Sequence, residues 1–187
     1  MNRIVAARVA GFTFLFYIVV GISAMAGVFH GLARELATIG QNASAVILAL
    51  TLYVVTRTDG PGLAGAGMLF RLAEGLLGAL VSVAGFALAQ RSLIAALLFA
   101  IGSTFFCWLF VRGRVMPRVL AWLGVLASLL LVVGLPLQIA GMLPRTITQV
   151  MWLPMLAFEV PAGLWLLFRG APKFRAHRSL FSAAEAG

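Results

Sequence analysis

Charged side chains are scarce in this chain of 187 residues, and acidic ones are the scarcest. There are 5 Asp and Glu residues against 14 Lys and Arg, and charged residues make up 10% of the sequence while hydrophobic residues make up 63%. A water-soluble domain needs far more charge on its surface. With a mean hydropathy of +1.08, the composition therefore predicts an integral membrane protein, and its length predicts a single helical bundle.

The shortage of cysteine, histidine and lysine excludes several kinds of site. Cys107 is alone, so no disulfide, CxxC redox pair or thiolate metal cluster can form. His30 and His177 lie at a span end and in the C-terminal tail, which excludes a bis-histidine haem and a histidine-rich metal site. No lysine or aspartate lies within an apolar run, which excludes a retinal Schiff base and an aspartyl membrane protease. We therefore expect no cofactor, no metal and no enzyme activity.

Apolar runs between charged residues predict six membrane-spanning helices, each near the ~20 residues that a bilayer requires. The expected spans are residues 9–29, 41–56, 65–90, 92–111, 119–142 and 148–168. We interpret the first run as a retained helix rather than a cleaved signal peptide. Residues 1–171 are thus expected to form one all-α transmembrane domain, followed by a basic cytoplasmic tail over residues 172–187.

The distribution of basic residues predicts the orientation. With the N-terminus in the cytoplasm, ten of the 14 basic residues fall on the inner side of the membrane, and six spans return the C-terminus to that side. Arginine supplies every basic residue except Lys173, which suggests a GC-rich bacterial genome and hence a bacterial inner membrane. Basic residues at the inner helix ends and in the tail predict contacts with anionic lipid headgroups rather than nucleic acid: Arg112, Arg114, Arg118, Lys173, Arg175 and Arg178.

Two segments outside the predicted spans have helical patterns. In residues 32–39, Leu32, Leu36 and Ile39 recur at helical spacing, which predicts a short helix lying on the outer surface. The tail after Pro172 is either an amphipathic helix on anionic lipid or a disordered basic segment that only enforces topology.

Three charged residues, Arg71, Glu74 and Glu159, lie inside predicted spans. An ionisable side chain is costly at the centre of a bilayer, so one found there is paired, faces a cavity or has a function. Arg71 and Glu74 are three residues apart and share a helix face. Glu159 falls at a similar depth, which predicts a contact between the third and sixth spans with one cation between two carboxylates. This cluster is either a clamp that fixes helix register or a site for a polar ligand or a proton.

Prolines occur beside one of these residues. Pro154 and Pro161 bracket Glu159, and a proline inside a helix leaves the carbonyl four residues earlier without its donor. Many transporters build their midplane sites at broken helices of this kind. Prolines in membrane helices also often produce only a bend. Pro136, in the fifth span, is a weaker instance of the same pattern.

Several short motifs resemble one family of bacterial six-helix membrane proteins, known only as domain of unknown function 4386. The segment from Arg114 through Pro117 and Arg118 to Gly124 resembles its R-S-x-x-P-R-x-L-G element, although the serine after the first arginine is missing. Its R-x-x-G, F-R and E…L-W-L-L…G elements are similar to Arg8–Gly11, Phe70-Arg71 and Glu159–Gly170. The first outer loop is shorter than in the family. The resemblance implies six spans, places Arg71, Arg118 and Glu159 in the family pattern, and supplies no activity.

These observations favour a non-enzymatic membrane protein whose core cluster organises the bundle or holds a small ligand or lipid, with a partner membrane protein or a second copy as possible companions. The alternative is a small proton-coupled transporter that uses Glu159 and Glu74. A lipid-modifying enzyme lacks a recognisable pair of nucleophile and base.

Overall fold

The computed structural model describes residues 2–83 and 89–171, and all regular structure in this part of the chain is helical. The helices are α1 (Arg3–Met25), α2 (Leu32–Thr56), α3 (Pro61–Val83), α4 (Ala89–Gly113), α5 (Arg118–Ile139), α6 (Arg145–Val150) and α7 (Leu153–Arg169). Six segments of the described residues are long and apolar enough to cross a membrane, and α6 and α7 together make up the last. The predicted all-α bundle with six transmembrane helices is confirmed. The predicted tail lies outside the described residues.

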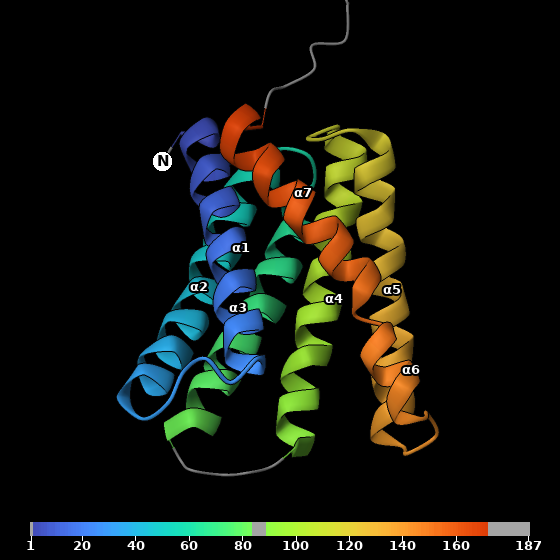
Figure 1. Ribbon diagram of the computed structural model, residues 1–187. Helices are drawn as coiled ribbons and strands as arrows, with labels where there is room; N and C mark the ends of the chain where they lie inside the picture. Colours follow the sequence, from blue (N-terminus) through green and yellow to red (C-terminus); the bar gives the residue numbers. More distant parts are fainter. Residues whose placement is uncertain (1, 84–88, 172–187) are drawn as a thin grey trace, which may run out of the picture.

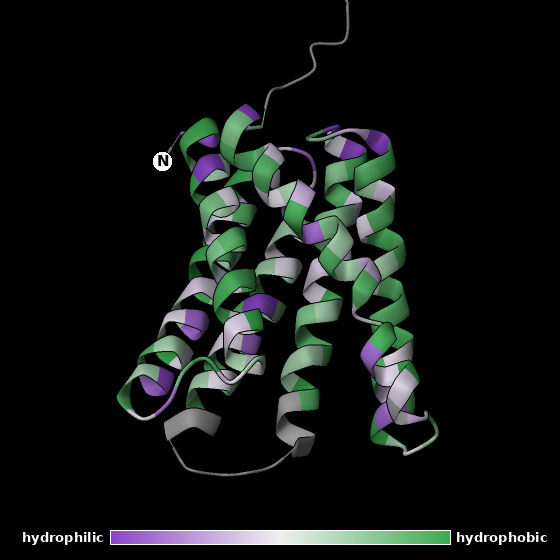
Figure 2. Ribbon diagram, in the orientation of Figure 1, coloured by the Kyte–Doolittle hydropathy of each residue, from purple (hydrophilic) through white to green (hydrophobic). Residues whose placement is uncertain are grey.

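The long helices form a closed ring. Each packs against the next along the chain, and α7 packs against both α5 and α1, crossing the front of the bundle diagonally in Figure 1. The start of α1, the end of α7 and the α2–α3 and α4–α5 connections share one end of the molecule, at the top of Figure 1. Hydrophobic residues cover most of the helix surfaces, and hydrophilic ones occur mainly near the ends, with a few inside the bundle (Figure 2).

Two helices end earlier than predicted. α1 stops at Met25 and α5 at Ile139, four and three residues short of the predicted limits. Beyond each end a glycine, Gly27 or Gly141, has a φ of 72°, and the N–H of the next residue returns to a carbonyl five residues earlier. This left-handed glycine cap terminates a helix even where the following side chains are apolar.

The prediction of a separate surface helix over residues 32–39 is wrong. These residues are the first turns of α2, which continues to Thr56. Leu32, Leu36 and Ile39 keep their helical spacing and stay exposed, but no proline interrupts the helix after them. A helix of 25 residues is about 38 Å long at ~1.5 Å per residue, so α2 is longer than the ~30 Å hydrocarbon core of a bilayer.

The predicted boundary between the third and fourth spans is also wrong. α4 already begins at Ala89, so Gln90 and Arg91 belong to α4 rather than to the end of α3 and a turn. A charge in the sequence therefore does not by itself mark the end of a helix. The connection, residues 84–88, lies outside the described residues.

The sixth predicted span is two helices. The break falls at Met151 and Trp152, directly before Pro154, which occupies the first turn of α7 where a missing N–H is tolerated. Pro161 and Pro136 lie inside α7 and α5, which continue through them. The breaks predicted at these two prolines are therefore absent, and each proline only removes one backbone donor.

The ring closes through a close backbone contact between α1 and α7. A Cβ atom placed on Gly11 would lie 2.5 Å from the carbonyl oxygen of Gly163, and it would also overlap the backbone of Leu167. Only glycine allows helices to approach this closely, as is common for small residues at membrane helix interfaces.

We expect Gly11→Ala to separate α1 from α7 and to destabilise the protein by about 1–3 kcal/mol, the usual range for an overpacked site. Gly65→Ala is the matched control, because Gly65 is also helical and its added methyl group would meet no atom within 4 Å. Since alanine is the better helix former, the control is expected to retain or slightly raise the midpoint of thermal unfolding in detergent. Equal effects of the two substitutions would contradict this account of the contact.

Candidate functional site

Arg71 is the most buried charged side chain among the described residues. It lies on α3 and is 1% exposed. Space for its aliphatic portion comes from α4, because a Cβ on Gly102 would lie 2.9 Å from the Arg71 Cγ. The position of the guanidinium thus depends on close packing between α3 and α4.

The charge partner of Arg71 is Glu74 on the same helix. The Nη1 atom of Arg71 is 2.9 Å from the Oε2 atom of Glu74, and both side chains are buried. The contact is an ion pair without hydrogen-bond alignment, and none of the three guanidinium nitrogens has a hydrogen-bond partner among the described residues. The predicted pairing of these two residues along one helix face is present.

Aromatic rings surround the same guanidinium. Its Cζ atom lies 4.6 Å from the centre of the Phe99 ring and 6.0 Å from that of Tyr17. These distances allow cation–π attraction, which strengthens where water is excluded. The Tyr17 hydroxyl also donates a hydrogen bond of 3.3 Å to Oε1 of Glu74. Groups from α1, α3 and α4 therefore converge on one charge.

The sequence did not predict a role for Tyr17 or Phe99, because an aromatic side chain in a membrane span, unlike a charged one, is not energetically unusual. A signal was available for Tyr17. It is one of two tyrosines in the chain and lies well inside a span, whereas tyrosines of membrane proteins concentrate at the interfaces. Phe99 carries no comparable signal among 14 phenylalanines.

Glu159 lies across a small cavity from Arg71. It is 7% exposed on α7 and interacts electrostatically with both Arg71 and Glu74, yet it forms no direct ion pair among the described residues. Arg71 and Glu159 both line a cavity of about 10 Å³. The predicted contact between the third and sixth spans is therefore an approach across this cavity, and the cation touches one carboxylate rather than two.

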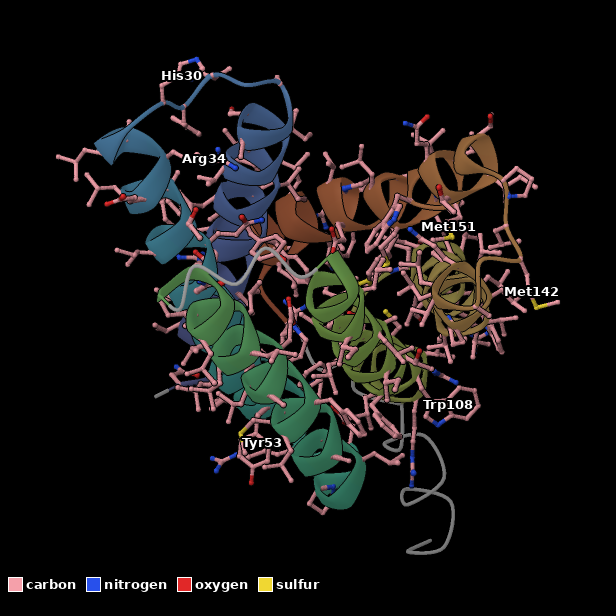
Figure 3. The ribbon with its side chains drawn as sticks, turned by 90° about the horizontal axis from the view of Figure 1, so that it is seen from below. His30, Arg34, Tyr53, Trp108, Met142 and Met151 are labelled. Atoms are coloured by element: carbon pink, nitrogen blue, oxygen red, sulfur yellow. The ribbon has the colours of Figure 1, made fainter. Side chains whose placement is uncertain are left out.

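The remaining candidates lie elsewhere. Arg112, Arg114 and Arg118 are exposed at the end of the molecule that holds the start of α1. Lys173, Arg175 and Arg178 lie outside the described residues. His30 lies on the connection between α1 and α2 at the periphery of the opposite end (Figure 3). No group of three potential metal ligands occurs among the residues that the structure describes.

A larger hollow of about 610 Å³ runs along α5, α6 and α7. Its walls are almost entirely apolar, including Ile147, Val150 and Leu153, and it shares no lining residue with the cavity beside Arg71. This hollow therefore provides no path to the charged cluster.

Two of the sequence motifs meet in space. Trp165 of α7 donates its indole N–H to the carbonyl oxygen of Val115, in the connection between α4 and α5, at 3.2 Å. Gly124 of α5 provides room for Phe158 and Cys107, since a Cβ there would lie 2.6 Å and 2.8 Å from atoms of these side chains. The motif residues of α5 and of the preceding connection thus hold α7 in place on the side of the ring opposite α1.

We expect Glu74→Gln to destabilise the protein by about 3 kcal/mol or more, because it leaves a buried guanidinium without a counter-charge. The double variant R71M/E74Q removes both charges and is expected to recover much of that loss. Thermal unfolding in detergent measures both, and Glu35→Gln is the control because Glu35 is exposed. If the double variant is less stable than Glu74→Gln alone, the stabilising effect of Glu74 does not come from its ion pair with Arg71.

Part of the chain matches a protein family. No curated protein and no solved structure matches the chain significantly. Residues 79–170 match the family described as Domain of unknown function (DUF4386). The match includes the motifs from Arg114 to Gly124 and from Glu159 to Gly170, while the motifs at Arg8 and Phe70 precede it. The family match over residues 79–170 agrees with the resemblance that the sequence motifs predicted.

Proposed function

We propose that this protein is a non-enzymatic, multi-pass protein of a bacterial inner membrane, in which the buried cluster of Arg71, Glu74 and Glu159 fixes the arrangement of the helices. One observation carries the proposal. The guanidinium is 1% exposed, is paired on its own helix and adjoins a cavity of about 10 Å³. A volume of roughly 10–15 Å³ on this scale is what one water molecule requires, which is too small for a transported solute or a lipid headgroup.

The exposed basic residues support a role at the inner leaflet. Arg112, Arg114 and Arg118 lie together at the end that the positive-inside rule assigns to the cytoplasm. Each basic residue near an anionic surface contributes about 1 kcal/mol of attraction. In this proposal the rigid bundle presents these side chains to anionic lipid headgroups, and a partner membrane protein or a second copy would bind through the exposed apolar faces of the helices.

The orientation is testable with single cysteines, because Cys107 is the only native one and is buried. In a Cys107→Ser background we expect a membrane-impermeant maleimide to label Val28→Cys in intact cells and to leave Thr58→Cys unlabelled until the cells are opened. Both positions are exposed in the structure, so accessibility within the fold is matched. The reverse labelling pattern would invert the proposed topology.

A second function, a proton-coupled carrier, is favoured by one observation. The cluster places two carboxylates around one guanidinium, so with all three groups ionised its formal charge is negative. A net charge at this depth is unfavourable, and a proton bound at Glu159 would remove it. In pumps and transporters, carboxylates inside the membrane bind and release protons.

Proton flux separates the two functions. In proteoliposomes with an entrapped pH-sensitive dye, a structural protein is expected to dissipate an imposed pH gradient no faster than protein-free liposomes. Glu159→Gln should then leave the rate unchanged. A faster decay in the wild-type protein that Glu159→Gln abolishes would favour the carrier, and the Glu35→Gln variant controls for effects of reconstitution.

A further inference from the structure

The guanidinium of Arg71 lacks hydrogen bonds that a buried group of its kind normally makes. Its Nε, Nη1 and Nη2 atoms are buried and have no hydrogen-bond partner among the described residues. The ion pair with Glu74 supplies an opposite charge, and the nearby Phe99 ring carries no oxygen or nitrogen acceptor. Buried polar groups without hydrogen bonds are rare and cost free energy. We therefore expect these N–H groups to have an acceptor.

The cavity beside Arg71 has the size for one small acceptor. Its volume is about 10 Å³, near the lower limit of ~10–15 Å³ at which a cavity admits one water molecule. Arg71, Ser103 and Glu159 are the polar residues of its lining, and the other walls are aromatic, aliphatic or sulfur-containing side chains. A buried water needs two to four polar partners, and these three residues meet that requirement.

The surrounding charges favour a neutral occupant. An anion in the cavity would face Glu159 and lie near Glu74, while a metal cation would lie beside the guanidinium of Arg71. Water can accept a hydrogen bond from an arginine N–H and donate one to a carboxylate, and so it suits both walls.

We propose that this cavity holds one ordered water molecule that accepts a hydrogen bond from Arg71 and donates one to Glu159. The water joins α3 to α7, two helices whose described residues form no direct ion pair across the cavity. This inference rests on the proposed structural role of the cluster, because it extends the Arg71–Glu74 pair to the helix that closes the ring.

Two variants of Ser103 test the bridge through the order of their stabilities. Ser103→Thr keeps the hydroxyl and adds a methyl group to the cavity, which would displace the water and leave Arg71 without its acceptor. Ser103→Ala leaves room for the water. We expect the midpoint of thermal unfolding of Ser103→Thr to fall by about 5 °C and that of Ser103→Ala to change less. The opposite order, with Ser103→Thr the more stable, is the result for a dry cavity that a methyl group fills, and it would overturn the bridge.

The proposed water molecule can also be observed directly. A density map of the wild-type protein at a resolution that shows ordered water is expected to contain one compact peak within hydrogen-bond distance of Arg71 and Glu159. A map without that peak, or with an elongated density, would overturn the proposal. Failure of the bridge is distinguishable from failure of the clamp, because Glu74→Gln would still destabilise a clamp that lacks the water.

Discussion

The burial of one guanidinium is the constraint on which the rest of this bundle depends. Arg71 is almost completely buried within the protein. A buried charge at membrane depth is energetically unfavourable unless the protein supplies compensating interactions. The compensation comes from several helices. Glu74 provides the opposite charge, Phe99 and Tyr17 provide aromatic faces, and Gly102 provides the space. Glu74 lies on the same helix as Arg71, but the other groups are effective only if the neighbouring helices keep their positions.

Close helix contacts maintain that arrangement. Gly11 brings α1 against α7 and Gly124 admits side chains of α4 and α7, while the indole of Trp165 ties α7 to the connection before α5. In a bilayer these contacts matter more than hydrophobicity, because lipid tails are as apolar as the side chains that they would replace. Packing and the central ion pair therefore support one another. The packing keeps bulk water and lipid away from the charge, and the charge limits how the helices can shift.

The fold was largely predictable from the sequence, and the site only in part. Composition and the spacing of charges identify six spans because the bilayer imposes a minimum length on each. Helix ends such as Met25 and the break before Pro154 depend on local backbone geometry that apolar runs do not encode. The pairing of Arg71 with Glu74 was predictable because it is local in the sequence. The roles of Tyr17, Phe99 and Gly102 were not, since they arise from the angle and register at which neighbouring helices pack, and a single sequence carries little information about either.

The spacing of Arg71 and Glu74 also affects how the chain can be made. A membrane protein is synthesised from its N-terminus, so α3 leaves the ribosome before α4 and α7, the helices that carry Phe99 and Glu159. Glu74, three residues along the same helix, is already present. The ion pair can therefore form within α3 itself, and this helix can enter the membrane as an electrically neutral segment. Glu159 arrives last, on the helix that completes the ring, when every other member of the bundle has been synthesised.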